Sequence, residues 1–72
     1  MKVLGVTVSQ EIQDECLARM KKQWFCAQHI QAIAQPFPRI NSSIAMRIAD
    51  RLIQRERKAG NIVRHGMGWI WK

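Results

Sequence analysis

The amino-acid sequence predicts a mainly α-helical domain of the α+β class that ends in a small β-hairpin. Three observations lead to this fold class. Three stretches repeat apolar residues with a helical period, a proline-containing segment separates the second from the third, and after Gly60 the period falls from about 3.6 residues to about 2. A chain of 72 residues has room for one domain with a small core. Residues 1–72 are therefore expected to form a single unit.

The first helix is predicted over residues 8–22. At 100° per residue, five apolar side chains fall on one side of it: Val8, Ile12, Cys16, Leu17 and Met20. The helix is expected to begin between Thr7 and Ser9, and Thr7 and Gln10 have the spacing of a capping box. Residues 1–7 are largely apolar but are interrupted by Gly5. They are expected to form a short strand or an extended arm.

A second, shorter helix is predicted over residues 26–35. Its apolar stripe includes Cys26 and Ile30. Phe25 and Ile30 have the spacing of a hydrophobic staple if Cys26 is the N-cap residue. The following segment, Pro36-Phe37-Pro38, ends the helix because each proline favours an extended residue before it.

The longest helix is predicted to begin at Asn41, Ser42 or Ser43, which are all good N-cap residues, and to end at Ala59 before Gly60. One side of this helix is apolar and comprises Ile44, Ala45, Ile48, Ala49, Leu52 and Ile53. The opposite side is polar and comprises Ser43, Arg47, Asp50, Arg51, Gln54, Arg57 and Lys58. The apolar side is therefore a predicted part of the core, and the polar side is predicted to face solvent.

Residues 61–72 are predicted to form the hairpin. Two β-prone runs, 61–64 and 69–72, are joined by a glycine-bearing turn at 65–68. An isolated hairpin is marginally stable in water, so this one is expected to lean on the helices. Trp69 and Trp71 share one face and are the expected anchors. In so small a core, Trp24 and one of these two tryptophans are expected to be buried.

The chain is strongly basic, and its charge is uneven. Twelve Lys and Arg residues oppose five Asp and Glu residues, which gives a net charge of +7. Residues 1–38 hold four basic and three acidic side chains, a net charge of +1, whereas residues 39–72 hold eight and two, a net charge of +6. Such an excess favours a polyanionic partner, with nucleic acid the first expectation and an anionic membrane surface the second.

Other classes of function find little support. No apolar run approaches the ~18 residues of a membrane span, and no secretion signal is evident. Cys16 and Cys26 are expected to be reduced thiols in a cytoplasmic protein. Together with His29 and His65 they do not provide the two paired spacings of a structural zinc site. No nucleophile–base pair or phosphate-binding loop is present, so neither an enzyme nor a cofactor is expected.

The strongest signal in the third predicted helix is a row of arginines. Arg47, Arg51 and Arg55 stand at i, i+4 and i+8, a spacing at which like charges destabilise an isolated helix. Asp50 can relieve Arg47 but not the whole row. Such a row is well suited to phosphates and guanine edges. The alternative is a solvated face whose arginines form salt bridges to acidic residues of the first helix, namely Glu11, Asp14 or Glu15.

The order of elements (helix, short aromatic strand, helix, turn, longer helix, hairpin) resembles a winged helix-turn-helix domain. Four segments carry the resemblance, which spans residues 8–72: Phe25–Ile30, Asn41–Ser43, Ala59–Val63 and Trp69–Trp71. The chain departs from the family in two places. Cys26 stands where the second helix often opens with Ser, Thr or Asp, and the turn at residues 36–40 is longer than that of simple helix-turn-helix proteins.

This resemblance implies a sequence-preferring protein that binds double-stranded DNA, with the third helix in the major groove and the hairpin as a wing on the adjacent backbone or minor groove. The residues expected to read bases are Ser42, Ser43, Arg47, Arg51 and Gln54. Contacts to the DNA backbone are expected from Arg39, Arg57 and Lys58, and contacts from the wing are expected from Arg64, His65 and Lys72.

The small size resembles that of transcriptional regulators of bacteria, phages and prophages, which would place the chain in the cytoplasm with the nucleoid. One such module buries little DNA surface, so tight binding is expected to need a dimer or a second protein. Two other functions remain open. The basic face could meet an acidic protein partner, or the domain could bind RNA.

Overall fold

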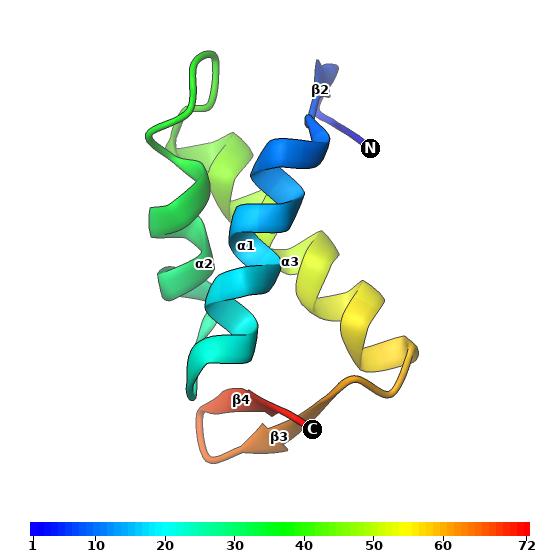
Figure 1. Ribbon diagram of the computed structural model, residues 1–72. Coiled ribbons are helices and arrows are strands. Elements are labelled where there is room, and N and C mark those ends of the chain that lie inside the picture. The colour runs from blue at the N-terminus through cyan, green and yellow to red at the C-terminus, as the bar shows by residue number, and fades with distance from the viewer.

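Three helices and a C-terminal two-stranded hairpin make up most of the computed structural model, which describes all residues 1–72 (Figure 1). The elements are β1 (Lys2–Val3), β2 (Val6–Thr7), α1 (Gln10–Lys22), α2 (Ala27–Ala34), α3 (Ser42–Lys58), β3 (Ile62–His65) and β4 (Gly68–Trp71). The α+β class and the order of the three helices and the hairpin agree with the sequence-based prediction. The N-terminal strands were not predicted as a pair.

The first seven residues form a hairpin rather than an extended arm. Val3 pairs with Val6, and the turn between them places both Leu4 (φ 50°) and Gly5 (φ 79°) in the left-handed region. A two-residue type I′ turn requires positive φ at both central positions, and its usual sequence signal is Asn-Gly or Asp-Gly. Leucine at the first position hides this signal. Val3 is buried, and the hairpin therefore contributes to the core.

Helix α1 begins at Gln10, so its N-cap lies at the late end of the predicted range, and the capping box expected at Thr7 does not form. The N-cap is Ser9, whose hydroxyl accepts a hydrogen bond from the backbone N–H of Ile12 at 3.3 Å. Thr7 is still paired with Lys2 in the N-terminal hairpin, so it cannot serve as a helix cap. Val8 lies before the helix but is buried, as its place in the apolar stripe predicted.

Cys26 is the N-cap of α2, as the staple spacing suggested. Its backbone N–H donates to Nδ1 of His29 at 3.1 Å, so the imidazole takes the place that Glu or Gln occupies in a capping box. Phe25 and Ile30 are both fully buried. The chain then turns at residues 36–40, where the N–H of Ile40 donates to the carbonyl oxygen of Phe37 at 3.2 Å.

Helix α3 is capped at both ends as the sequence predicted. The side chain of Asn41 accepts from the N–H of Ile44 at 2.9 Å. At the other end, Gly60 has φ 79°, and the N–H of Asn61 donates to the carbonyl oxygen of Glu56 at 3.0 Å. This is the hydrogen-bond pattern of a Schellman motif, which requires a left-handed residue after the helix.

One hydrophobic core joins the three helices and both hairpins. All six apolar side chains predicted for α3 are buried in it: Ile44, Ala45, Ile48, Ala49, Leu52 and Ile53. Cys16 and Met20 of α1 and Ile30 and Ala34 of α2 are fully buried as well. The opposite side of α3 is consequently directed to solvent.

The C-terminal hairpin is joined to the rest of the fold through Phe25. Its two strands are antiparallel, with Ile62 opposite Trp71. Phe25 adds a one-residue strand on the free side of β4, because its N–H and carbonyl oxygen exchange hydrogen bonds with Trp69 at 3.0 and 2.8 Å. The turn contains two residues, Gly66 and Met67, rather than the four expected. Residues 65 and 68 continue the ladder instead.

Burial of the tryptophans differs from the prediction. Trp24 is 39% exposed, and Trp69 and Trp71 are half-buried against the core. Trp24 lies outside the core at the edge of the hairpin, where its indole N–H donates to the carbonyl oxygen of His65 at 2.9 Å. The tryptophan therefore ties the link between α1 and α2 to the hairpin turn.

Candidate nucleic-acid interface

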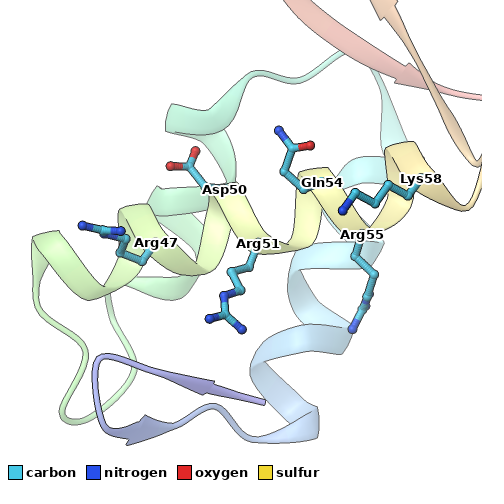
Figure 2. Close-up of a pocket in the computed structure, with 6 residues that line it drawn as sticks. All are labelled: Arg47, Asp50, Arg51, Gln54, Arg55 and Lys58. Carbon is cyan, nitrogen blue, oxygen red and sulfur yellow. The ribbon is translucent and has the colours of Figure 1, made fainter.

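The outer face of α3 forms a shallow groove that is lined only by polar and charged residues. Its lining consists of Arg47, Asp50, Arg51, Gln54, Arg55 and Lys58, which all project from one helix (Figure 2). All six side chains are exposed. The buried apolar set on the other side of α3 fixes the rotation of the helix, so the direction of this polar face follows from core packing.

The basic side chains of this groove are mostly without an acidic partner. The chain contains a single ion pair, Arg55 with Glu56, whose Nε and Oε2 atoms are 2.9 Å apart. Arg47 and Arg51 consequently form no salt bridge to Asp50 or to the acidic residues of α1. The sequence allowed Asp50 to compensate the charge of Arg47, but no ion pair forms between them. The salt bridges from the arginines to acidic residues of α1, which the alternative required, do not form either.

Arg55 differs from the other two arginines of the row. Its Nη1 donates to the side-chain oxygen of Gln13 on α1 at 3.0 Å, in addition to its contact with Glu56. Gln13 is buried, and its own Nε2 donates to the carbonyl oxygen of Val8 at 3.2 Å. Arg55 therefore joins α3 to α1, and the unrelieved row shortens to Arg47 and Arg51.

Glu56, the buried partner of Arg55, has a pKa that is shifted from its ordinary value. Burial raises the pKa of its carboxyl, but hydrogen bonds from Asn61 and Arg55 and the charges of Arg55 and Lys21 outweigh burial. The pKa of Glu56 therefore lies below its ordinary value. Asn61 donates to Oε1 at 2.9 Å, so both carboxylate oxygens are occupied. Glu56 is thus a structural acid that closes the C-terminal end of α3.

Gln54 lies on the groove, but its oxygen is already engaged. Arg57 donates to Oε1 of Gln54 through Nε at 3.1 Å and through Nη2 at 2.7 Å. A glutamine that reads adenine must both accept and donate, so Gln54 would have to exchange Arg57 for the base. Lys58, one residue further, is exposed and has no side-chain hydrogen bond in the structure.

The three predicted wing residues are exposed, and among them Arg64 makes contacts through its side chain. The Nε of Arg64 donates to the carbonyl oxygen of Gly66 at 3.1 Å, and its guanidinium lies 5.1 Å from the centre of the Trp69 ring. His65 contributes its carbonyl oxygen to Trp24, and Lys72 donates its backbone N–H to Asn61 at 2.9 Å. Stacking on Trp69 holds the charge of Arg64 beside the hairpin while leaving it accessible.

The two glycines of the hairpin have separate roles. Gly66 has φ 64°, as the first central position of a two-residue hairpin turn requires. Gly68 instead makes room for the adjacent segment. A Cβ atom there would collide with the carbonyl oxygen of Phe25 and lie 2.5 Å from Cζ2 of Trp24. Gly68 is therefore required by internal packing rather than by the backbone conformation of the turn.

The remaining predicted residues lie before or at the start of α3. Ser42 and Ser43 are exposed in its first turn. Arg39 is exposed in the preceding turn, where its φ of 67° places it in the left-handed region. Pro38 before it and the hydrogen bond from Ile40 to Phe37 define a type II turn, whose third position normally holds Gly or Asn. Arginine at this position carries backbone strain.

The side chains capable of other chemistry are dispersed over the fold. No three His, Cys, Asp or Glu side chains lie together as a metal-binding group. Cys16 is fully buried, and burial, with a smaller effect of Glu15, raises the pKa of its thiol to about 11. Cys26 is half-buried at the start of α2. No helix has both the length and the apolar character needed to cross a membrane.

The structure therefore brings Arg47, Arg51, Gln54 and Lys58 onto one face, with Ser43 at its start. It places Arg64 and His65 on a separate element. Sequence reasoning did not assign a binding role to Asp50, although its position on the polar side of the helix was the available signal. Comparison with protein-family models, with curated proteins and with solved structures finds no match for this chain.

Proposed function

We propose that this chain is a winged helix-turn-helix module that binds double-stranded DNA. In this proposal α2 and α3 form the helix-turn-helix, α3 enters the major groove, and the β3–β4 hairpin is the wing. The observation that carries the proposal is the outer face of α3, where Arg47, Arg51 and Lys58 are exposed and have no acidic partner. Unpaired guanidinium groups on one rigid helix suit phosphates and the O6 and N7 atoms of guanine.

The position of the hairpin supports the same proposal. Phe25 pairs with β4, and the indole N–H of Trp24 donates to the carbonyl oxygen of His65, so the hairpin is fixed to the link between α1 and α2. It follows α3 directly, after the turn at Gly60 (Figure 1). A hairpin held in this way can present Arg64 to DNA beside α3 with little loss of conformational freedom on binding.

The proposed contacts fall into two classes. Bases would be read by residues on the outer face of α3, namely Ser42, Ser43, Arg47, Arg51 and Gln54. Phosphates would be held by Arg39, Arg57, Lys58 and the wing, and these phosphate contacts would supply most of the affinity. The strained φ of Arg39 favours this role, because a cation at the turn before α3 gives a reason for a residue other than glycine. The biological role would be that of a small regulator acting on DNA, with a second copy increasing the contact area.

A competition experiment tests the proposal against RNA binding and against an acidic protein partner. A fluorescent DNA duplex of about 20 base pairs is bound by the chain and displaced by unlabelled duplex DNA, duplex RNA, single strands or an acidic polypeptide. We expect duplex DNA to compete best. The deep, narrow major groove of RNA does not admit a helix, so better competition by RNA would replace the DNA proposal with an RNA-binding function.

The control variants are matched in charge. Arg47→Ala and Lys22→Ala each remove one exposed basic side chain, the first from the outer face of α3 and the second from the end of α1. We expect Arg47→Ala to weaken duplex binding by about 1–3 kcal/mol and Lys22→Ala to have a much smaller effect. Equal losses from the two variants would indicate an unspecific attraction of the whole basic surface and would contradict the role of α3.

A further inference from the structure

Asp50 is the one exposed acidic side chain on α3 and lies among its basic residues. It lines the same groove as Arg47, Arg51 and Lys58, and its side chain projects on the same side of the helix as Gln54 (Figure 2). No ion pair and no side-chain hydrogen bond engages its carboxylate. Both oxygens are therefore open to a partner from outside the chain.

Its position on the helix is central to the exposed face. Counting 100° per residue, Ser43 and Gln54 lie almost directly opposite the middle of the buried apolar set. Asp50 and Arg47 lie about 30° to either side of that line, whereas Arg51 lies about 70° from it. A DNA duplex that docks on the middle of this face therefore lies directly against Asp50.

A free carboxylate at that position opposes binding to DNA in general, because it repels every phosphate and the acceptor atoms of most bases. It gains only where a base offers a donor without a neighbouring acceptor. In the major groove, guanine presents two acceptors, thymine presents an acceptor and a methyl group, and adenine places the acceptor N7 beside its amino group. Cytosine is the only base whose own major-groove edge presents a donor, the N4 amino group, without an acceptor.

We infer that Asp50 determines sequence specificity by accepting a hydrogen bond from the N4 amino group of a cytosine in duplex DNA. This inference rests on the proposed function and adds to it a base preference. In this arrangement Arg47 and Lys58 attract the duplex, and Asp50 repels every site that lacks the cytosine. The carboxylate thus lowers affinity for unspecific DNA more than affinity for the correct site.

Selection of bound sites from a random duplex pool tests the inference with four proteins. The wild type should select a site with one strongly preferred cytosine, by about five- to hundredfold over other bases. Asp50→Ala should lose the preference at that position. Asp50→Asn should shift it toward adenine, because an amide can donate to N7 while it accepts from N6. Asp14→Asn makes the same change of charge on α1 and should select the wild-type site.

Affinity for a duplex without the selected site gives a second readout. Both Asp50 variants should bind it about threefold more tightly than Asp14→Asn does, because they remove a charge that directly faces the phosphates. If the wild type binds duplex DNA but shows no cytosine preference, or if the Asp50 variants select an unchanged site, the inference is wrong and the proposed function stands. If the wild type binds no duplex at all, the proposed function and the inference fail together.

Discussion

The guanidinium of Arg55 on α3 donates to the side-chain oxygen of Gln13 on α1, across 3.0 Å and 42 residues of sequence. This contact separates Arg55 from Arg47 and Arg51, although the three have one regular spacing along the helix. Arg55 is engaged in the fold, and the other two are free on its surface. One helix therefore carries both an internal polar connection and the face that we propose meets DNA.

Replacing single arginines of this row should separate their two roles. Arg55→Ala leaves the oxygen of buried Gln13 and one oxygen of buried Glu56 without their partner, so it should lower the free energy of unfolding by about 1–3 kcal/mol. Arg51→Ala should change it by less than about 0.5 kcal/mol. Urea unfolding followed by circular dichroism measures both. Equal stability of the two variants would contradict the structural role of Arg55.

The neighbour of Arg51, Leu52, should behave in the opposite way because it is fully buried. Leu52→Ala should cost about 2–5 kcal/mol through the lost contacts and the cavity that remains, which is enough to unfold a domain of this size. Met46 is an apolar residue of the same helix but is 52% exposed, so Met46→Ala provides the matched control. A smaller loss for Leu52→Ala than for Met46→Ala in urea unfolding would mean that the rotation of α3 is wrong.

Gly68 should be the most sensitive position in the hairpin. The Cβ atom of Gly68→Ala would displace Phe25 or Trp24, and overpacking of this kind costs roughly 1–3 kcal/mol. Met67 next to it is 88% exposed, so Met67→Ala should be nearly neutral. Urea unfolding compares the two, and chemical shifts of the Trp24 indole N–H report whether its bond to His65 survives. An undisturbed indole signal in Gly68→Ala would contradict the close packing described here.

The lowered pKa of Glu56 predicts how the free energy of unfolding changes at acidic pH. A carboxyl group with a pKa below its ordinary 4.5 in the folded state stabilises the fold fully above that pH, and this contribution disappears as the pH falls through the folded-state value. The wild type should therefore be more stable than Glu56→Gln at neutral pH, by an amount that shrinks below about pH 4.5. Unfolding free energies measured along a pH series check this. A difference that does not change with pH would contradict it.

Much of the fold could be predicted because its signals are local. The apolar stripe of α3, its Asn41 cap and its Gly60 terminus all lie within one segment, and they fixed the buried side of the helix. The N-terminal hairpin was missed because Leu4 occupies a left-handed position that sequence rules reserve for Asn, Asp or Gly. The capping box expected at Thr7 was wrong for a related reason, since pairing of Thr7 in that hairpin removes it as a cap.

The parts of the site that escaped prediction depend on contacts between distant segments. Gln13 meets Arg55, Trp24 meets His65, and Gly68 meets Trp24 only after the chain has folded. No spacing rule within a single helix or strand reveals these pairs. The helix period did place Arg47, Arg51 and Gln54 on one exposed face, because that follows directly from the position of the buried residues.

The salt dependence of duplex binding tests the central claim most directly. If four to six phosphates are neutralised, the logarithm of the binding constant should fall with the logarithm of salt concentration with a slope of about −4 to −5. The double variant Arg47→Ala and Arg51→Ala should stay folded and bind more weakly but keep most of that slope, because these side chains are proposed to read bases rather than to neutralise phosphates. A slope near zero, or no binding of duplex DNA at low salt, would contradict the account.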